Sequence, residues 1–168
     1  ALVFRYTIVE GNTDSSDLSV SSYNGTIQDS AGNTADAVSG DLGAVIVDAN
    51  KPTLTSVGIA SNNTVNSAYA KVGRDVTLTF TANETINAPS VAFTTSDDDA
   101  IADGSIAYSN TSGNTWTAVY TTESGDTTGA VGFTISFSDT AGNSGDNVTA
   151  VTNGSSCLLY TSDAADDM

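Results

Sequence analysis

The chain has 168 residues but no histidine, one cysteine (Cys157), two prolines and four basic residues against 20 acidic ones, which leaves a net charge of -16. The missing histidines exclude the usual nucleophile–base pairs and histidine metal sites, and a single cysteine cannot close a disulfide within the chain. So few basic residues argue against binding of nucleic-acid phosphates or anionic membranes, which need clustered Lys or Arg. No apolar run is long enough for a transmembrane helix. We therefore expect neither a nucleic-acid partner nor membrane insertion.

Enzyme activity would have to depend on carboxylates alone, as in a glycosidase with paired acids. The acids of this chain lie in turn-like segments, and none stands in an apolar run opposite another acid. We therefore expect no catalytic residue, no enzyme activity and no organic cofactor.

The chain does contain many short runs in which apolar and polar residues alternate, the period of half-buried strands. In the first part of the chain, strands are expected at residues 2–9, 18–23 and 44–47. In the second part they are expected at residues 54–60, 75–82, 90–93, 104–108, 115–121, 132–138 and 147–152, with an irregular continuation at 65–72. Seven strands and no helical period predict an all-β fold, and this number is typical of an immunoglobulin-like antiparallel β-sandwich. Trp116 is expected in its core.

A five-residue turn occurs twice, at residues 29–33 (Asp-Ser-Ala-Gly-Asn) and 139–143 (Asp-Thr-Ala-Gly-Asn). We name the copies the Asp29 turn and the Asp139 turn. Asp can accept a hydrogen bond from the backbone two residues on, and Gly and Asn tolerate positive φ, so both copies predict hairpin corners. Their recurrence predicts two copies of one module. The expected domains are the carboxy-terminal part of a first repeat, a short linker stiffened by proline and a complete repeat, at residues 1–47, 48–52 and 53–156.

The two turns, the linker phrase "VDANKPT" and the phrases "TLTFTANETI" and "NTWTAVYTT" resemble the bacterial immunoglobulin-like repeats of very large secreted or surface-attached adhesins. The resemblance covers nearly all of residues 1–156. It implies sandwich repeats, the first truncated, that act as a structural spacer or adhesion module outside the cell or on its surface, frequently stiffened by calcium. The implied partners are neighbouring repeats of the same chain, and surface glycans or host or biofilm components.

The last residues are treated separately. Residues 157–166, "CLLYTSDAAD", resemble the translation of a transposase adapter used in sequencing-library preparation. We therefore exclude residues 157–168 from the expected fold and function as an artefactual tail. Removing the three aspartates of this tail leaves 17 acidic residues (20 minus 3) and a net charge of -13 (-16 plus 3), so the acidity belongs to the rest of the chain.

Acidic and amide side chains occur in loops that a seven-strand sandwich would bring to the joint between two modules. The loops after its second, fourth and sixth strands share one end, and residues 10–17 would lie beside the linker at the end of the preceding module. Ca²⁺ takes about six to eight oxygen ligands from such groups. The alternative is that the same residues only form turns in solvated loops. The candidate ligands are Glu10, Asn12, Asp14, Asp48, Glu84 and Asp139.

A second acidic group, formed by Asp97, Asp99 and Asp103, is expected at the opposite end of the second module. Its spacing does not match an EF-hand loop, because Ile101 stands where an oxygen ligand is needed. The group is either half of a calcium site or a solvated run of charge.

The alternative function is a carbohydrate-binding or accessory domain of a modular extracellular enzyme. That function predicts aromatic side chains exposed on a sheet face or a loop tip. Burial of Tyr108, Trp116 and Tyr120 would therefore count against it.

Overall fold

The structure is a computed structural model that describes residues 5–20, 25–35, 40–41, 45–95 and 106–160. The chain separates into two compact units, Ala1–Asn50 and Lys51–Met168, and each is described here by itself. All regular secondary structure in the described segments is β-strand, as the alternating sequence pattern predicts. In these segments no helix has the length and apolar character needed to cross a membrane.

The described residues of the first unit contain little regular structure. Among them, β1 (Ser19–Val20) and β2 (Gly40–Asp41) pair antiparallel, and single bridges join Ser15 to Val47 and Gln28 to Thr34. The strand expected at 2–9 is wrong for residues 5–9, which form no strand. Of the strands expected at 18–23 and 44–47, the described residues form β1 at 19–20 and a single bridge at Val47, while residues 21–23 and 44 lie outside the description. An alternating run becomes a strand only where a neighbouring strand takes up its hydrogen bonds.

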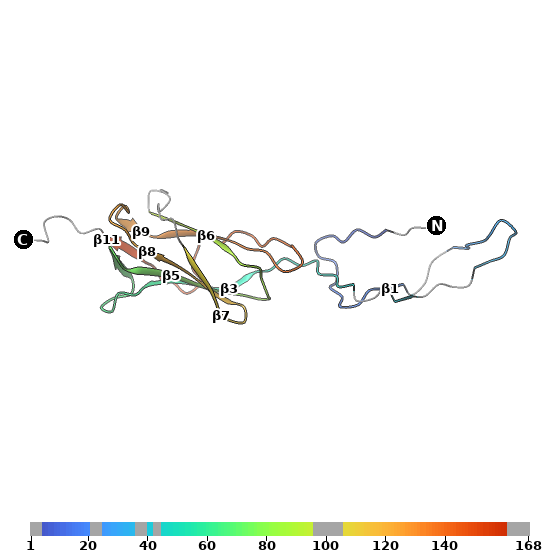
Figure 1. Ribbon diagram of the computed structural model, residues 1–168, viewed down its shortest axis with the longest axis horizontal. Coiled ribbons are helices and arrows are strands. Elements are labelled where there is room, and N and C mark those ends of the chain that lie inside the picture. Colours follow the sequence, from blue (N-terminus) through green and yellow to red (C-terminus); the bar gives the residue numbers. More distant parts are fainter. Residues whose placement is uncertain (1–4, 21–24, 36–39, 42–44, 96–105, 161–168) are drawn as a thin grey trace, which may run out of the picture. The chain divides into compact units, whose positions relative to one another are not determined.

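The second unit is a β-sandwich (Figure 1). One layer is a four-stranded antiparallel sheet in the order β3-β5-β8-β7. Its strands are, in that order, Leu54–Ser61, Asp75–Ala82, Thr115–Thr121 and Ala107–Ser112. In β5 the side chains of Val76, Leu78 and Phe80 are buried while the threonines between them face outward. The apolar alternation of the sequence therefore determines which face of this sheet covers the core.

The other layer combines two small sheets. In the first, β6 (Ser90–Thr94) pairs antiparallel with β10 (Gly132–Ser136). In the second, β4 (Tyr69–Lys71) and β9 (Gly129–Ala130) lie on either side of β11 (Leu158–Tyr160). Only one residue separates β9 from β10, so the two small sheets continue each other. The pairing of β11 with β4 is parallel, which differs from the purely antiparallel sandwich expected from the sequence.

Three expectations for this unit need correction. Residues 157–160 belong to the fold, because β11 is a strand and Cys157 and Leu159 are buried, which raises the pKa of the Cys157 thiol to about 11. Buried apolar side chains at alternate positions are enough to place these residues in the sheet, even if they come from an adapter sequence. Residues 161–168 lie outside the described residues. In the described part of the strand expected at 104–108, Ile106 is not in a strand and β7 begins at Ala107. The strand expected at 147–152 is a single bridge between Val148 and Ile135, because the chain then crosses to the edge of β3.

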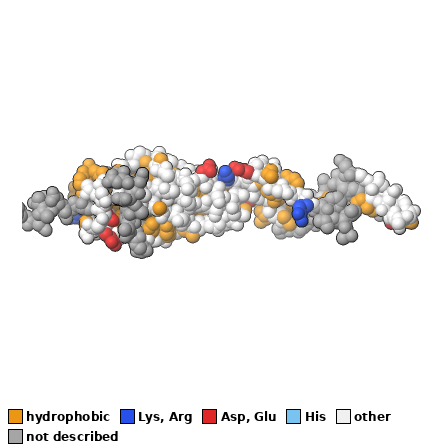
Figure 2. Space-filling view, turned by 90° about the horizontal axis from the view of Figure 1, so that it is seen from above, with side chains coloured by type: hydrophobic (Ala, Val, Ile, Leu, Met, Phe, Trp, Pro, Cys, Tyr) orange, Lys and Arg blue, Asp and Glu red, His pale blue; other side chains and the backbone are white. Residues whose placement is uncertain are grey.

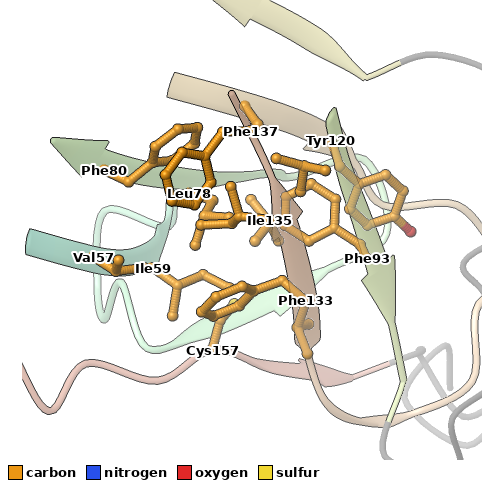
Figure 3. Close-up of a cluster of buried hydrophobic side chains, with 14 of the residues drawn as sticks. Val57, Ile59, Leu78, Phe80, Phe93, Tyr120, Phe133, Ile135, Phe137 and Cys157 are labelled. Atoms are coloured by element: carbon orange, nitrogen blue, oxygen red, sulfur yellow. The ribbon is translucent and has the colours of Figure 1, made fainter. Parts of the chain in front are cut away.

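The core lies between the two layers (Figure 3). Leu78 and Phe80 of β5 point toward Ile135 and Phe137, which come from β10 and the residue after it. The rings of Phe93 and Tyr120 meet across the layers with their centroids 5.7 Å apart. Trp116, expected in the core, packs against it and is half-buried.

Candidate functional site

The Asp29 turn of the first unit is closed by its own aspartate. Asp29 Oδ1 accepts hydrogen bonds from the backbone N–H groups of Ala31 and Asn33, both at 2.9 Å, and Oδ2 accepts one from Asn33 Nδ2 at 2.8 Å. The backbone N–H of Asp29 donates to Asn33 O at 3.0 Å, and Gly32 has a φ of 85°. The turn is therefore a hairpin corner bridged on either side by Gln28 and Thr34.

The Asp139 turn of the second unit has the same construction. Asp139 Oδ1 accepts from the backbone N–H groups of Gly142 and Asn143 at 2.7 and 2.8 Å, and Oδ2 accepts from Asn143 Nδ2 at 2.8 Å. Asp139 N donates to Asn143 O at 3.0 Å, and Gly142 has a φ of 99°. Ser138 and Ser144 form the flanking bridge. Two segments 110 residues apart (139 minus 29) thus share the bonds between the aspartate and the asparagine four residues on, while the second backbone donor to Oδ1 is Ala31 in one copy and Gly142 in the other.

Both carboxyl groups are held in the ionised form. The pKa of Asp29 is lowered by hydrogen bonds, first from the Asn33 side chain and then from the turn backbone. At Asp139 burial acts to raise the pKa, but hydrogen bonds from Asn143, Gly142 and Ala141 outweigh it, so the pKa is again lowered. Asp29 is exposed, whereas Asp139 is 0% exposed. The second copy is therefore a buried carboxylate whose charge is balanced by N–H donors.

The Asp139 turn contacts the loop that follows β5, and this loop in turn contacts the turn between β7 and β8. Ile86 bridges to Asp139, and Asn87 donates from its backbone N to Ser138 O at 2.9 Å and from its side chain to Asp139 O. The turn between β7 and β8 contributes Asn114, whose Oδ1 accepts a hydrogen bond from the hydroxyl of Thr85 at 3.4 Å.

The loop that precedes Ile86 contains Glu84, which is half-buried and accepts a hydrogen bond from Asn83 Nδ2 at 3.4 Å. Asn83 also ties this loop to the start of β3, because Thr53 N donates to its Oδ1 at 2.7 Å. The second unit thus brings its two predicted ligands, Glu84 and Asp139, to the same end, where the chain enters the sandwich.

The first unit brings its predicted ligands close to its carboxy-terminal residues, Ala49 and Asn50. Asp14 accepts from Ala49 N at 2.9 Å and from Asn50 Nδ2 at 2.7 Å, and these bonds lower its pKa. Asn12 Oδ1 accepts from Val9 N at 2.8 Å and from the Tyr6 hydroxyl at 3.1 Å.

Within the same end of the first unit, Asp48 accepts from Asn50 N at 3.4 Å, and Glu10 is exposed on the loop of Asn12 and Asp14. This loop is tied to the end of the unit because Gly11 N donates to Ala49 O at 3.1 Å. A calcium site that draws ligands from both units stays a prediction.

The second predicted group, Asp97, Asp99 and Asp103, lies outside the described residues. Asp126, in a different loop, has a structural role: its Oδ2 accepts from the Tyr120 hydroxyl and from Glu123 N. On the face shown in Figure 2, acidic side chains stand in small groups among uncharged ones, so the acidity is not gathered into one large patch there.

Sequence analysis missed a groove of about 600 Å³ beside β3. None of its lining residues is charged, and they include Gly58, Thr79, Asn153 and Ser155. The dipeptide Asn153-Gly154 is the only local signal at this place, since the groove forms where the chain after β10 docks on a strand almost 100 residues earlier.

No family model, curated protein sequence or solved structure matches this chain.

Proposed function

We propose that this chain is a structural spacer or adhesion module of a bacterial repeat protein that is secreted or held at the cell surface. The observation that carries the proposal is the shared hydrogen-bond pattern of the Asp29 and Asp139 turns. A turn reproduced in two units of one chain supports tandem copies of one module, and tandem sandwiches are a means of spacing a distal domain from its anchor. Neighbouring repeats are then the first partners of each module.

The sheet order supports an immunoglobulin-like module. If β3, β5, β6, β7, β8 and β10 are taken as strands A to F, the four-stranded sheet reads A-B-E-D, and β6 with β10 supplies the C–F pair of the other sheet. This is the arrangement of constant-type immunoglobulin sandwiches. The likeness concerns strand order and does not specify a ligand.

Sequencing of the complete gene tests the spacer proposal. Further copies of the Asp-x-Ala-Gly-Asn module on either side are expected. An adjoining catalytic domain with no further copies would overturn the proposal and favour the accessory-domain function. The structure offers that alternative limited support, since Tyr120 is buried and Trp116 packs on the core, while Tyr108 is 40% exposed with its hydroxyl bonded to the backbone of Val91.

Calcium at the joints is a separate part of the proposal. Asp14 and Asp139 are ionised and held in place by N–H donors, and a carboxylate oxygen that accepts one N–H bond keeps a lone pair for a cation. Binding by ligands from both sides of a joint would restrict the motion of one module against the next.

Calorimetric titration of the full chain with CaCl₂, together with thermal melts in Ca²⁺ and in chelator, tests this part. Asp139→Asn is expected to weaken Ca²⁺ binding, whereas Asp29→Asn, in the same turn of the other unit, is expected to leave it unchanged. Absence of any heat of binding and identical melts would remove calcium from the proposal and leave the spacer function standing.

A further inference from the structure

The segment that follows Val148 docks on the outer edge of β3 and satisfies backbone groups there. Val57 N donates to Thr152 Oγ1 at 2.9 Å, and Thr152 N donates to Val57 O at 2.9 Å. Two residues further along β3, Ile59 N donates to Ser155 Oγ at 2.8 Å. We name residues 152–155 the β3 strap. Thr152 and Ser155 are its anchors, and they cover an edge that would otherwise present unpaired N–H groups.

The two residues between the anchors are Asn153 and Gly154, and both are exposed. The side chain of Asn153 lies over Gly58, where an added Cβ would come within 2.5 Å of Asn153 Nδ2. Its Oδ1 accepts a hydrogen bond from Ser155 N at 3.0 Å. Gly154 has a φ of 72°, and in the described part of the chain its N–H makes no hydrogen bond.

We propose that Asn153-Gly154 is a site of spontaneous deamidation and isomerisation that releases the β3 strap. After loss of its proton, Gly154 N attacks Cγ of Asn153, the new N–Cγ bond closes a succinimide, and ammonia leaves with the former side-chain nitrogen. Water then opens the ring at either carbonyl and gives aspartate or isoaspartate. The step needs no enzyme, oxidant or metal, and it is independent of the proposed spacer function.

The structure favours this reaction in three ways. Gly154 has no side chain to hinder ring closure, and its N–H is not engaged elsewhere. The hydrogen bond from Ser155 N polarises the carbonyl that is attacked. The adjoining groove of about 600 Å³ gives water access to the product ring.

Two other asparagines provide matched controls. Asn63 and Asn66 accept the same kind of hydrogen bond, from the backbone N–H two residues on, at 3.0 Å in each case. Their following residues are Thr64 and Ser67 instead of glycine. A difference in rate between Asn153 and these sites therefore reports the contribution of Gly154.

Isoaspartate would act on the strap through the backbone. It inserts a methylene into the main chain between the two anchors, so Thr152 and Ser155 can no longer both match the spacing of Val57 and Ile59. The aspartate product keeps the backbone length and adds only a charge. The isoaspartate product is therefore expected to open the strap, and the aspartate product to leave it docked.

The first experiment measures deamidation of the full chain, incubated folded and urea-unfolded at mildly alkaline pH, by peptide mass spectrometry with isoaspartyl methyltransferase labelling. Asn153 is expected to react several-fold faster than Asn63 and Asn66 in the folded chain, and Gly154→Ala is expected to slow it. If the unfolded chain reacts at Asn153 while the folded chain retains the amide, the fold protects this site and the proposal is wrong.

The second experiment measures amide hydrogen exchange of the aged chain after separation of the isoaspartate form. Faster exchange of Val57 and Ile59 is expected, with Leu78 in the central strand β5 unchanged as the internal control. Asn153→Asp, which mimics the unisomerised product, is expected to keep Val57 and Ile59 protected. Equal protection in the isoaspartate form would show that the strap tolerates the longer backbone, and that result overturns the release.

Discussion

Replacement of Asp139 tests whether its carboxylate stabilises the turn at residues 139–143 and, through it, the folded second unit. Asp139→Ala removes the acceptor of three N–H groups, two on the backbone of Gly142 and Asn143 and one on the Asn143 side chain. Asp139→Asn keeps Oδ1 as the acceptor of the two backbone groups and loses only the bond from Asn143 Nδ2. The two variants therefore separate the backbone closure of the turn from the side-chain bond.

The magnitude follows from the groups left without a partner. Loss of a buried hydrogen-bond partner costs about 1–3 kcal/mol, and water can reach part of this turn because Gly142 is exposed. We expect Asp139→Ala to lower the free energy of unfolding by about 1–3 kcal/mol and Asp139→Asn by about 1 kcal/mol or less. For a domain of this size, each kcal/mol lowers Tm by about 4 °C.

The pH dependence has a defined sign. The folded pKa of Asp139 lies below its unfolded value of 3.8, so the stabilisation by its ionised form is complete above that value. It is lost as the pH falls through the folded pKa and the carboxylate takes up a proton in both states. The stability difference between the wild type and Asp139→Asn is therefore expected to be constant near neutral pH and to shrink in acid.

Urea unfolding followed by tryptophan fluorescence measures this effect in the second unit, because Trp116 is the only tryptophan of the chain and lies in β8. Asp29→Ala, in the same turn of the first unit, serves as control and should leave the Trp116 transition unchanged. Equal transitions for wild type and Asp139→Ala, or a larger loss for Asp139→Asn than for Asp139→Ala, would refute the reasoning.

Two further predictions concern packing. A Cβ at Gly145 would meet the ring of Phe137 and lie within 2.9 Å of Pro52 O, so Gly145→Ala is expected to destabilise the second unit by about 1–3 kcal/mol, measured by the same unfolding assay. Gly125→Ala, where a Cβ would meet nothing within 4 Å, is its control, and similar losses in both variants would contradict the packing argument. In the first unit, Tyr6 is 72% exposed and Ile8 45%, so their amides should exchange with solvent much faster than those of β5 and β8; uniform protection of residues 5–20 would contradict this.

The features that could be predicted from sequence are those whose partners lie close along the chain. The hydrogen bonds that Gly142 and Asn143 donate to the Asp139 carboxylate come from residues three and four positions away, so the motif contains its own geometry. Strand β5 has the predicted bounds because its side chains alternate between core and solvent along its whole length and the fold supplies a partner strand on each side. Residues 5–9 alternate in the same way but form no strand, since alternation does not supply the partner.

The placement of the candidate ligands was predictable to the extent that it follows from strand order. Loops after alternate strands of a sandwich share an end, and the loop of residues 83–89 does contact both Asn114, through Thr85, and Asp139, through Ile86 and Asn87. Whether such residues hold a cation depends on how two modules are placed against each other, which no local pattern encodes.

By itself the sequence determined the all-β class, the apolar faces of β5, β8 and β10 and the two Asp-centred turns, because period-two burial and short-range hydrogen bonds depend only on neighbouring residues. Only the tertiary structure decided that Thr152 and Ser155 cap β3, that β11 runs parallel to β4 and that Asn153 lies over Gly58. These contacts join residues nearly 100 positions apart. They arise from the way the chain closes the sandwich and cannot be derived from any one segment.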